Sequence, residues 1–155
     1  MKMNEMTIDP DRLENGAWVD DIPEMEGLRL KVRGSQNSDW RRLQAKLLEA
    51  VPRKRRIGGR VDQDDMERII TSCLLNACLL DWDGLEGDDG QPISFSKPMA
   101  EKLLKEPEYR RFRDGVVYAA SIVAENLEQN KEDITGNLLT LSAGSTGGER
   151  KSKVG

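Results

Sequence analysis

The chain has 155 residues, of which 34% are charged and 37% hydrophobic, and its formal net charge at pH 7 is −4. This length suits one domain of modest size, but the composition is more polar than that of an average globular domain, so we expect part of the chain to stay unfolded. Histidine is absent from the sequence, which removes the commonest general base and the commonest metal ligand. Serine–histidine and cysteine–histidine catalysis and most zinc sites are thereby excluded, and we expect neither enzymatic activity nor a cofactor.

The cysteines and the apolar runs favour a reduced, aqueous compartment. Cys73 and Cys78 fall on one predicted helix, where five residues amount to about 7.5 Å of rise, beyond the usual reach of a disulfide. We expect two free thiols in a cytoplasmic protein. The N-terminal residues lack the apolar stretch of a signal peptide, and no apolar run approaches the length of a membrane span, so we expect no membrane association.

The N-terminal part of the chain is expected to form a β-ribbon. Residues 1–14 are polar and contain Asp-Pro-Asp, which indicates a flexible N-terminus. Residues 17–22 and 28–34 are strand candidates, and the second alternates apolar with basic side chains, as a strand with one buried face does. The sequence Pro-Glu-Met-Glu-Gly between them suits a hairpin loop.

Apolar residues that recur every three or four positions predict four helices, over residues 37–51, 62–80, 97–106 and 107–127. Asn37 or Ser38 can cap the first helix, and Ser96 can cap the third. After residue 129 the periodicity is lost, and glycine, serine and charged residues indicate a flexible polar tail or linker over residues 130–155. We therefore predict a mainly α protein: a compact four-helix domain over residues 15–129 with a short N-terminal antiparallel β-ribbon and a disordered C-terminal tail.

The segment LLDWDGLEGDDGQPISF, residues 79–95, raises the question of a calcium site because it holds five acidic residues and three glycines. A calcium loop that begins at Asp81 finds an oxygen ligand at position 3, in Asp83, but meets leucine at position 5 and proline at position 12. Other starting points fare no better. Since Asp-Gly favours a tight turn, we predict a structured connector whose apolar residues fold inward, and we expect no metal site.

Basic residues are concentrated in residues 41–60, which hold eight Lys or Arg against one Glu, whereas residues 61–109 hold twelve acids against four bases. The basic patch comprises Arg41, Arg42, Lys46, Arg53, Lys54, Arg55, Arg56 and Arg60. Such a cluster is typical of a nucleic-acid site, but the whole chain is acidic and no aromatic residue interleaves the basic run. The patch could equally complement the acids of residues 61–109 or an acidic partner. One functional hypothesis is therefore a small nucleic-acid-binding regulator that uses residues 41–60, and we keep it as an alternative.

The order of motifs from residue 79 onwards resembles the tail assembly chaperones of long-tailed, siphovirus-type bacteriophages. An apolar helix ends in Trp-x-Gly, a Gly/Asp turn and Pro-x-x-Phe-Ser follow, a short helix ends in LLKEPEYRRF, and a long helix ends in AENLE. In the first half, GAWVDDI and LRLKVRGSQNSDWRRL look like the N-terminal ribbon and first helix of that family. The resemblance covers about residues 16–127.

The resemblance implies a mostly helical, non-enzymatic protein that acts in the cytoplasm of the infected bacterial host and is absent from the mature virion. Its partners would be the aggregation-prone tape measure protein and the tail-tube subunit, which in many phages is recruited by a longer, frameshifted form; self-association is left open. Aromatic residues are the candidates for partner contact, although each also suits the core: Trp40, Trp82, Phe95, Tyr109 and Phe112. A structural head–tail adaptor is a further alternative, which would persist in purified virions.

Overall fold

The structure, a computed structural model, describes residues 1–125, and the tail expected over residues 130–155 lies outside them. The described part contains the α-helices α1 (Pro10–Asn15), α2 (Ser38–Glu49), α3 (Gln63–Ala77), α4 (Lys97–Lys105) and α5 (Arg110–Glu125). One antiparallel sheet has the order β1 (Ala17–Val19), β2 (Arg29–Val32), β5 (Leu79–Asp83), and a second consists of β3 (Arg56–Ile57) and β4 (Arg60–Val61). Short 3₁₀ turns cover Met3–Glu5, Arg53–Arg55 and Pro107–Tyr109.

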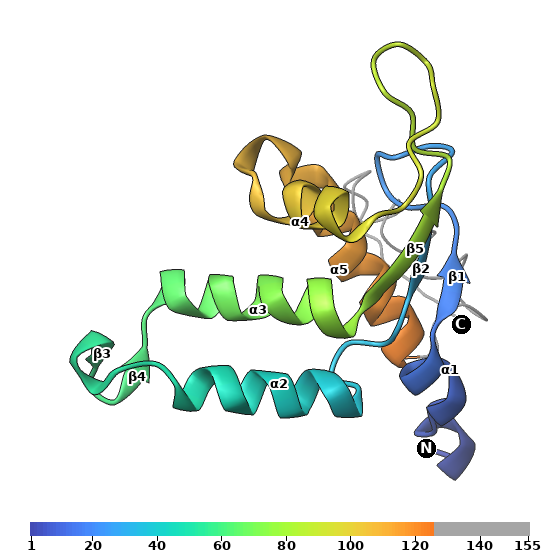
Figure 1. Ribbon diagram of the computed structural model, residues 1–155. Coiled ribbons are helices and arrows are strands. Elements are labelled where there is room, and N and C mark those ends of the chain that lie inside the picture. The colour runs from blue at the N-terminus through green and yellow to red at the C-terminus, as the bar shows by residue number, and fades with distance from the viewer. Residues whose placement is uncertain (126–155) are drawn as a thin grey trace, which may run out of the picture.

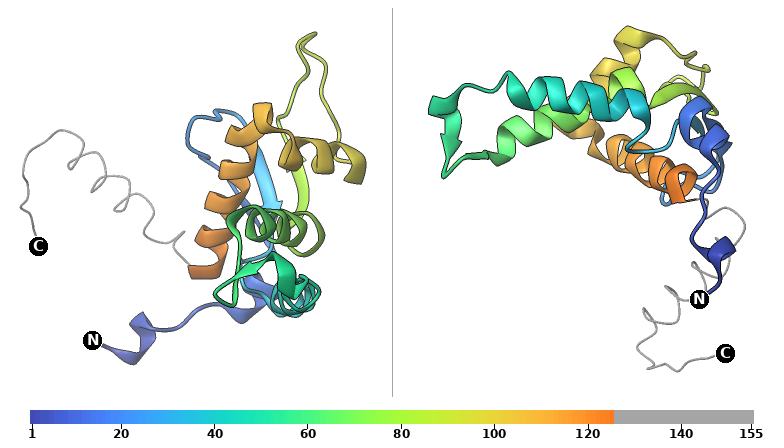
Figure 2. Two further views of the ribbon diagram at one scale, coloured as in Figure 1. Left: turned by 90° about the vertical axis from the view of Figure 1, so that its left-hand side faces the viewer. Right: turned by 90° about the horizontal axis from the view of Figure 1, so that it is seen from below.

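The helices α2 and α3 lie side by side and project from the rest of the molecule, and the β3–β4 hairpin joins their far ends (Figure 1). We call this projection, residues 38–77, the arm, and its far end, residues 53–61, the tip. In the body, α5 packs across the three-stranded sheet, α4 packs against α5, and α1 contacts α5 as well. Figure 2 shows that the arm extends well beyond the body.

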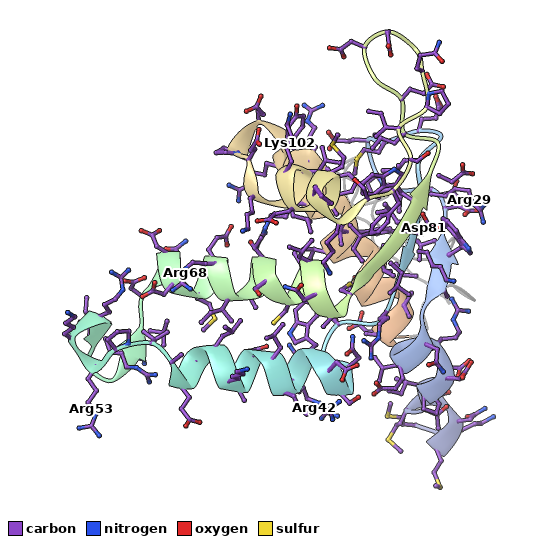
Figure 3. The ribbon with its side chains drawn as sticks, in the orientation of Figure 1. Arg29, Arg42, Arg53, Arg68, Asp81 and Lys102 are labelled. Carbon is purple, nitrogen blue, oxygen red and sulfur yellow. The ribbon has the colours of Figure 1, made fainter. Side chains whose placement is uncertain are left out.

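The three-stranded sheet buries one face against α5 and exposes the other. Val19, Leu30 and Trp82 lie opposite one another across the three strands, and all three are buried. The next row along the strands includes Lys31 and Asp81, which point to the opposite face because successive residues of a strand alternate. Figure 3 labels Asp81 on β5. The alternation of apolar and basic residues predicted for this part of the chain thus reflects a sheet with one buried face.

The strand β5 contains one residue more than its ladder with β2 requires. Lys31 pairs with Asp81, but Val32 pairs with Leu79, so that Leu80 forms a bulge between the two pairs. The side chain of Leu80 is accordingly exposed, whereas Leu79 is buried. Because the bulge adds one residue to β5, Leu79 and Trp82 point to the same face of the sheet although they are three residues apart. The pairs Val32–Leu79 and Leu30–Trp82 are therefore both buried on that face.

The prediction of a four-helix domain with a single β-ribbon is wrong. A further helix, α1, precedes the ribbon and is capped by Asp9, whose side chain accepts hydrogen bonds from the backbone N–H groups of Asp11 and Arg12. The basic run contributes a second sheet, the β3–β4 hairpin. The helix predicted over residues 62–80 ends at Ala77, and the residues that follow form β5, which turns the ribbon into a three-stranded sheet. The apolar run at this point fits a buried strand as well as a helix, so periodicity alone could not place the boundary.

Cys73 and Cys78 are buried, free thiols. Burial raises the pKa of Cys73 to about 11 and the pKa of Cys78 to about 12. The Cys78 Sγ lies 3.3 Å from the carbonyl oxygen of Arg33, to which it donates. Because both groups remain protonated at neutral pH, they serve as small core residues and not as nucleophiles.

The side chain of Asn37 ties the arm to the body. It is fully buried, and its Oδ1 accepts a hydrogen bond from the backbone N–H of Trp40 at 2.9 Å, which confirms the predicted cap of α2. Its Nδ2 donates to the carbonyl oxygens of Gly34 at 2.8 Å and Ala77 at 2.7 Å. One amide group therefore joins the segment after β2, the first turn of α2 and the last residue of α3.

We expect Asn37→Ala to destabilise the protein substantially. The change removes a helix cap, which costs about 1 kcal/mol, and leaves two buried carbonyl groups without a partner, each at about 1–3 kcal/mol, so the free energy of unfolding should fall by about 3 kcal/mol or more. Urea denaturation followed by circular dichroism measures this difference. Asn76→Ala is the matched control, because Asn76 is an exposed amide near the same end of α3 and its loss should cost less than about 0.5 kcal/mol. Equal, small losses for the two variants would contradict the role of Asn37.

Candidate partner-binding site

Three aromatic side chains from separate segments pack together in the body. Trp82 comes from β5, Phe95 from the segment before α4, and Phe112 from α5. The ring centroid of Trp82 lies 4.9 Å from that of Phe95 and 5.7 Å from that of Phe112, both in edge-to-face geometry. The indole N–H of Trp82 donates to the carbonyl oxygen of Ile93 at 2.7 Å, so the buried ring has no unsatisfied polar atom. Such pairs contribute about 0.5–1.5 kcal/mol each beyond burial of the rings. The aromatic cluster therefore stabilises the packing of these three segments against one another.

An open groove of about 440 Å³ lies over this cluster. Its apolar lining comes from the β1–β2 connection, the loop after β5, α4, the 3₁₀ turn that follows α4, and α5. It consists of Met25, Leu28, Leu85, Ile93, Met99, Leu103, Tyr109 and Phe112. Its charged rim consists of Glu26, Glu86, Asp88 and Lys102. Several of the apolar residues pack against the core but remain half-buried, namely Met25, Leu85, Ile93, Met99 and Tyr109. The groove therefore offers apolar contact area inside a predominantly acidic rim.

One wall of the groove is the loop between β5 and α4, which is a hairpin-like turn. The N–H of Ile93 donates to the carbonyl of Leu85 at 2.8 Å, and the N–H of Gly87 donates to the carbonyl of Gln91 at 2.9 Å. Gly90 closes the turn at a φ of +80°, which agrees with the turn predicted from Asp-Gly. Among residues 1–125, no three side chains of the metal-ligating types lie close enough together to hold an ion.

Met25, which lines the groove, packs against a glycine in α5. A Cβ atom at Gly115 would lie 2.1 Å from the Cε of Met25 and 2.9 Å from the Cγ2 of Ile22. The connection between β1 and β2 therefore packs directly on the helix backbone at this point. This close contact holds Met25 at the edge of the groove.

Four of the five predicted contact residues lie at or beneath the groove. Tyr109 and Phe112 line it, while Trp82 and Phe95 lie in the aromatic cluster that Phe112 belongs to. Trp40 lies apart from them: it is buried in α2, and its indole N–H donates to a side chain of the same helix at 2.8 Å. The structure thus brings together aromatic residues that are far apart in the sequence.

Sequence reasoning missed the aliphatic part of the site, which includes Met25, Leu28, Met99 and Leu103. An apolar stripe on the predicted helix over residues 97–106 was the available signal. That stripe is present in α4, but a periodic pattern does not show that one edge of it faces an opening and the other edge faces the core.

The eight residues of the predicted basic patch fall into two groups. Three residues of the patch bind other groups of the protein. Arg42 pairs with Asp39, Arg55 pairs with Asp65, and Arg56 donates to a backbone carbonyl at the end of α2. The other five are exposed and form no ion pair within the described residues, namely Arg41, Lys46, Arg53, Lys54 and Arg60. The patch therefore contributes partly to the fold of the arm, and the pair of Arg55 with Asp65 agrees with the alternative that basic residues of the patch complement the acids of residues 61–109.

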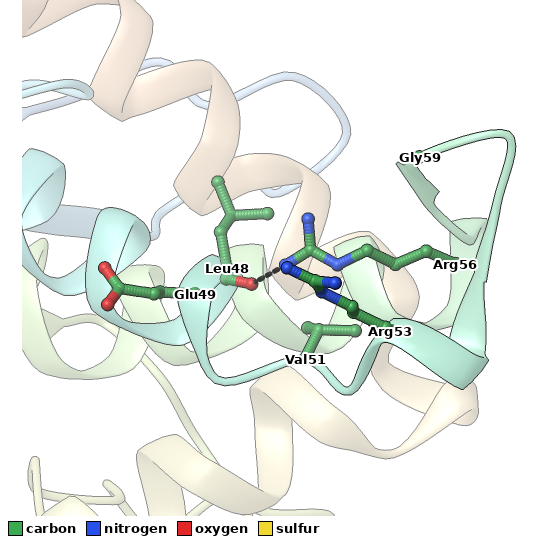
Figure 4. A pocket seen from close by; sticks show the side chains of 6 residues that line it. All are labelled: Leu48, Glu49, Val51, Arg53, Arg56 and Gly59. Carbon is green, nitrogen blue, oxygen red and sulfur yellow. Dashed lines mark hydrogen bonds between the residues drawn. The ribbon is translucent and has the colours of Figure 1, made fainter.

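A hollow of about 650 Å³ lies between the end of α2 and the tip (Figure 4). It is lined by Leu48, Glu49, Val51, Arg53, Arg56 and Gly59. The guanidinium group of Arg56 reaches across it to the carbonyl oxygen of Leu48, as Figure 4 shows. Arg56 thereby fastens the tip to α2.

Asp65 fastens the tip to α3 from within an almost fully buried position. Its carboxylate accepts two hydrogen bonds from Arg55, at 2.9 and 3.0 Å, and one from Arg68 at 2.7 Å. Its backbone N–H donates to the side chain of Asp62, which caps α3, at 2.8 Å. The guanidinium groups, Arg55 first and then Arg68, lower the pKa of Asp65 from 3.8 to about 2.

Comparison with known proteins identifies one family. The family model described as YdaY prophage protein matches residues 35–137, about two thirds of the 155 residues, including the whole arm, the groove loop and α4. No curated protein and no solved structure matches the chain. None of the helices within residues 1–125 is both long enough and apolar enough to cross a membrane.

The carboxylate of Asp65 should make the stability of the arm depend on pH. Because its pKa is about 2 in the folded protein and 3.8 as the reference value, its contribution is complete above about pH 5 and is lost as the pH falls through 3.8 towards 2. We expect Asp65→Asn to be less stable than the wild type at pH 7, and this difference to shrink as the pH is lowered, in urea denaturations at a series of pH values. Asp64→Asn is the control, because Asp64 is its exposed neighbour. If the difference in free energy of unfolding between Asp65→Asn and the wild type stayed constant from about pH 6 to about pH 2, the ionised carboxylate of Asp65 would not stabilise the arm.

Proposed function

Because the chain belongs to the YdaY prophage protein family and is thus of bacteriophage origin, we propose that it is a non-enzymatic tail assembly chaperone that binds the tape measure protein of its phage. The observation that supports this proposal most directly is the open, apolar groove of about 440 Å³ on a body that is otherwise rich in charge. The order of motifs from residue 79 to residue 112, which resembles this class of chaperone, supplies most of the residues of the same groove.

The groove has the chemistry that an amphipathic helix of a client would need. Such a helix places apolar side chains in a hydrophobic groove at intervals of three and four residues. Each apolar side chain that is buried in this way contributes about 1.5–3 kcal/mol, so several anchors together are needed to outweigh the entropy that the two chains lose on association. The charged rim keeps the protein in solution while the apolar floor is unoccupied.

The proposal places the protein in the cytoplasm of the infected bacterium during tail assembly, with the tail-tube subunit as its second partner. The chaperone leaves before the virion is complete, whereas a structural head–tail adaptor would remain. Mass spectrometry of purified virions separates the two: the chaperone is expected to be absent, and its presence in stoichiometric amounts would contradict the proposal.

We expect co-expression with the tape measure protein of the same phage to raise the amount of that client in the soluble fraction and to yield a complex that survives high salt. The double variant Leu85→Asn and Met99→Gln replaces two half-buried apolar groove residues by polar residues of similar size. Loss of one apolar anchor of about 1.4 kcal/mol weakens binding tenfold, so the variant should bind the client at least about tenfold more weakly. Affinity is measured by titration of a client fragment.

The control for this experiment is the double variant Leu80→Asn and Val117→Thr, which changes two exposed apolar residues outside the groove lining. It should bind the client as the wild type does. Equal loss of binding in both double variants, or no solubilisation by the wild type, would contradict the proposal. Nucleic acid that co-purifies at low salt and dissociates steeply as the salt concentration rises would favour the nucleic-acid-binding regulator instead.

A further inference from the structure

We propose that the tip of one copy of the protein docks into the groove of a second copy. The tip presents an apolar side chain between cations, and the groove presents an apolar floor between carboxylates. The two surfaces are complementary in both polarity and charge. This contact concerns the protein alone and does not depend on whether the groove also receives a client.

The tip is a narrow protrusion with an exposed isoleucine near its end. The side chain of Ile57 is 79% exposed, and the chain reverses directly after it at Gly58 and Gly59, whose φ values are +58° and +80°. No atom lies within 4 Å of the place where a Cβ of either glycine would stand, so the protein leaves this end open. The flanking Lys54 and Arg60 are exposed and form no ion pair within the described residues.

The groove offers the matching surface. Its rim has three carboxylates, from Glu26, Glu86 and Asp88, against one ammonium group, from Lys102. Its floor is apolar, and its volume of about 440 Å³ accommodates a branched aliphatic side chain together with part of a two-residue turn. An isolated exposed isoleucine needs no explanation on a protein surface. Ile57 differs from such a residue in its position, because the same short hairpin carries the cations that the rim would pair with.

The groove that receives the tip must belong to another copy. The tip lies beyond the N-terminal end of α3 and the groove lies beyond the C-terminal end, where the chain continues into β5 and its loop; the 15 residues of α3 alone span about 22 Å. Figure 1 and Figure 2 show the tip and the loop after β5 at opposite ends of the molecule. The arm is fixed at its base by Asn37 and at its tip by Asp65, so the tip does not fold back onto its own body.

A contact between a tip and a groove joins two different surfaces, so each copy retains one free tip or one free groove. Such a heterologous contact produces open chains, or rings where the rotation closes. The tip is small compared with the interfaces of stable complexes, so the association is expected to be weak, to rise with protein concentration and to fall as salt screens the ion pairs.

Charge reversal on the two surfaces tests the proposal with the protein alone. The tip variant is Lys54→Glu with Arg60→Glu, and the rim variant is Glu86→Lys with Asp88→Lys; none of these side chains forms an ion pair in the described part. In sedimentation equilibrium at low salt, the average mass of the wild type should rise with concentration, and each variant alone should associate at least about tenfold more weakly. An equimolar mixture of the two variants should associate again, because an acidic tip then meets a basic rim and a basic tip meets an acidic rim.

Two further variants complete the test. Ile57→Ser should weaken association at unchanged charge, whereas Arg41→Glu with Lys46→Glu, which reverses two exposed charges on the arm outside the tip, should leave it unchanged. A wild type that stays monomeric at low salt, single variants that associate normally, or a mixture that fails to associate would each overturn the proposal. The same holds if a fluorescent DNA duplex binds tightly to a monomeric wild type and not to the tip variant, because the tip would then serve nucleic acid.

Discussion

A buried amide, that of Asn37, joins the arm to the body at the base of the arm, where α3 also packs against α4 and Arg113 of α5 donates to Thr71 of α3. The side chain of Asn37 makes all of its hydrogen bonds within 3 Å to backbone groups of three segments, so its burial leaves no polar group unpaired. Covalent continuity reinforces this junction, because α3 passes directly into β5 and the arm thereby shares a segment with the sheet. A helical pair that was joined to the body only by flexible loops would swing freely. Here the tip and the groove keep a defined spacing, which self-docking between copies requires.

The basic residues within residues 41–60 form one cluster in the sequence, but they have two different roles in the structure. Arg55 binds the buried carboxylate of Asp65 and Arg56 binds a backbone carbonyl of α2, so these two side chains hold the tip against the two helices. The exposed basic residues around them keep their charges available to a partner. Composition alone does not show which basic residues have which role, because that depends on which arginines lie next to an acceptor group in the folded chain. This is why only five of the eight residues of the predicted patch form no ion pair within the described residues.

Structural features that depend on a few neighbouring residues were predictable from the sequence, whereas features that depend on contacts between distant segments were not. The caps at Asn37 and Ser96 and the pairing of β1 with β2 follow from local residue types and alternation, and the structure has them. The end of α3 is decided by the pairing of the next residues with β2, a contact some fifty residues away in the chain that no local pattern contains. The groove depends on still more distant contacts. Trp40 and Tyr109 both lie on predicted helices, yet one is enclosed and the other lines an opening.

The bulge at Leu80 bears on how the length of the chain can vary. The ladder between β2 and β5 pairs Val32 with Leu79 and Lys31 with Asp81, and it would run without interruption if Leu80 were absent. A shift of one residue in a strand normally turns every later side chain to the other face of the sheet. In this strand a chain shorter by one residue at the bulge keeps Leu79 and Trp82 on the inner face, so a deletion there would preserve the core.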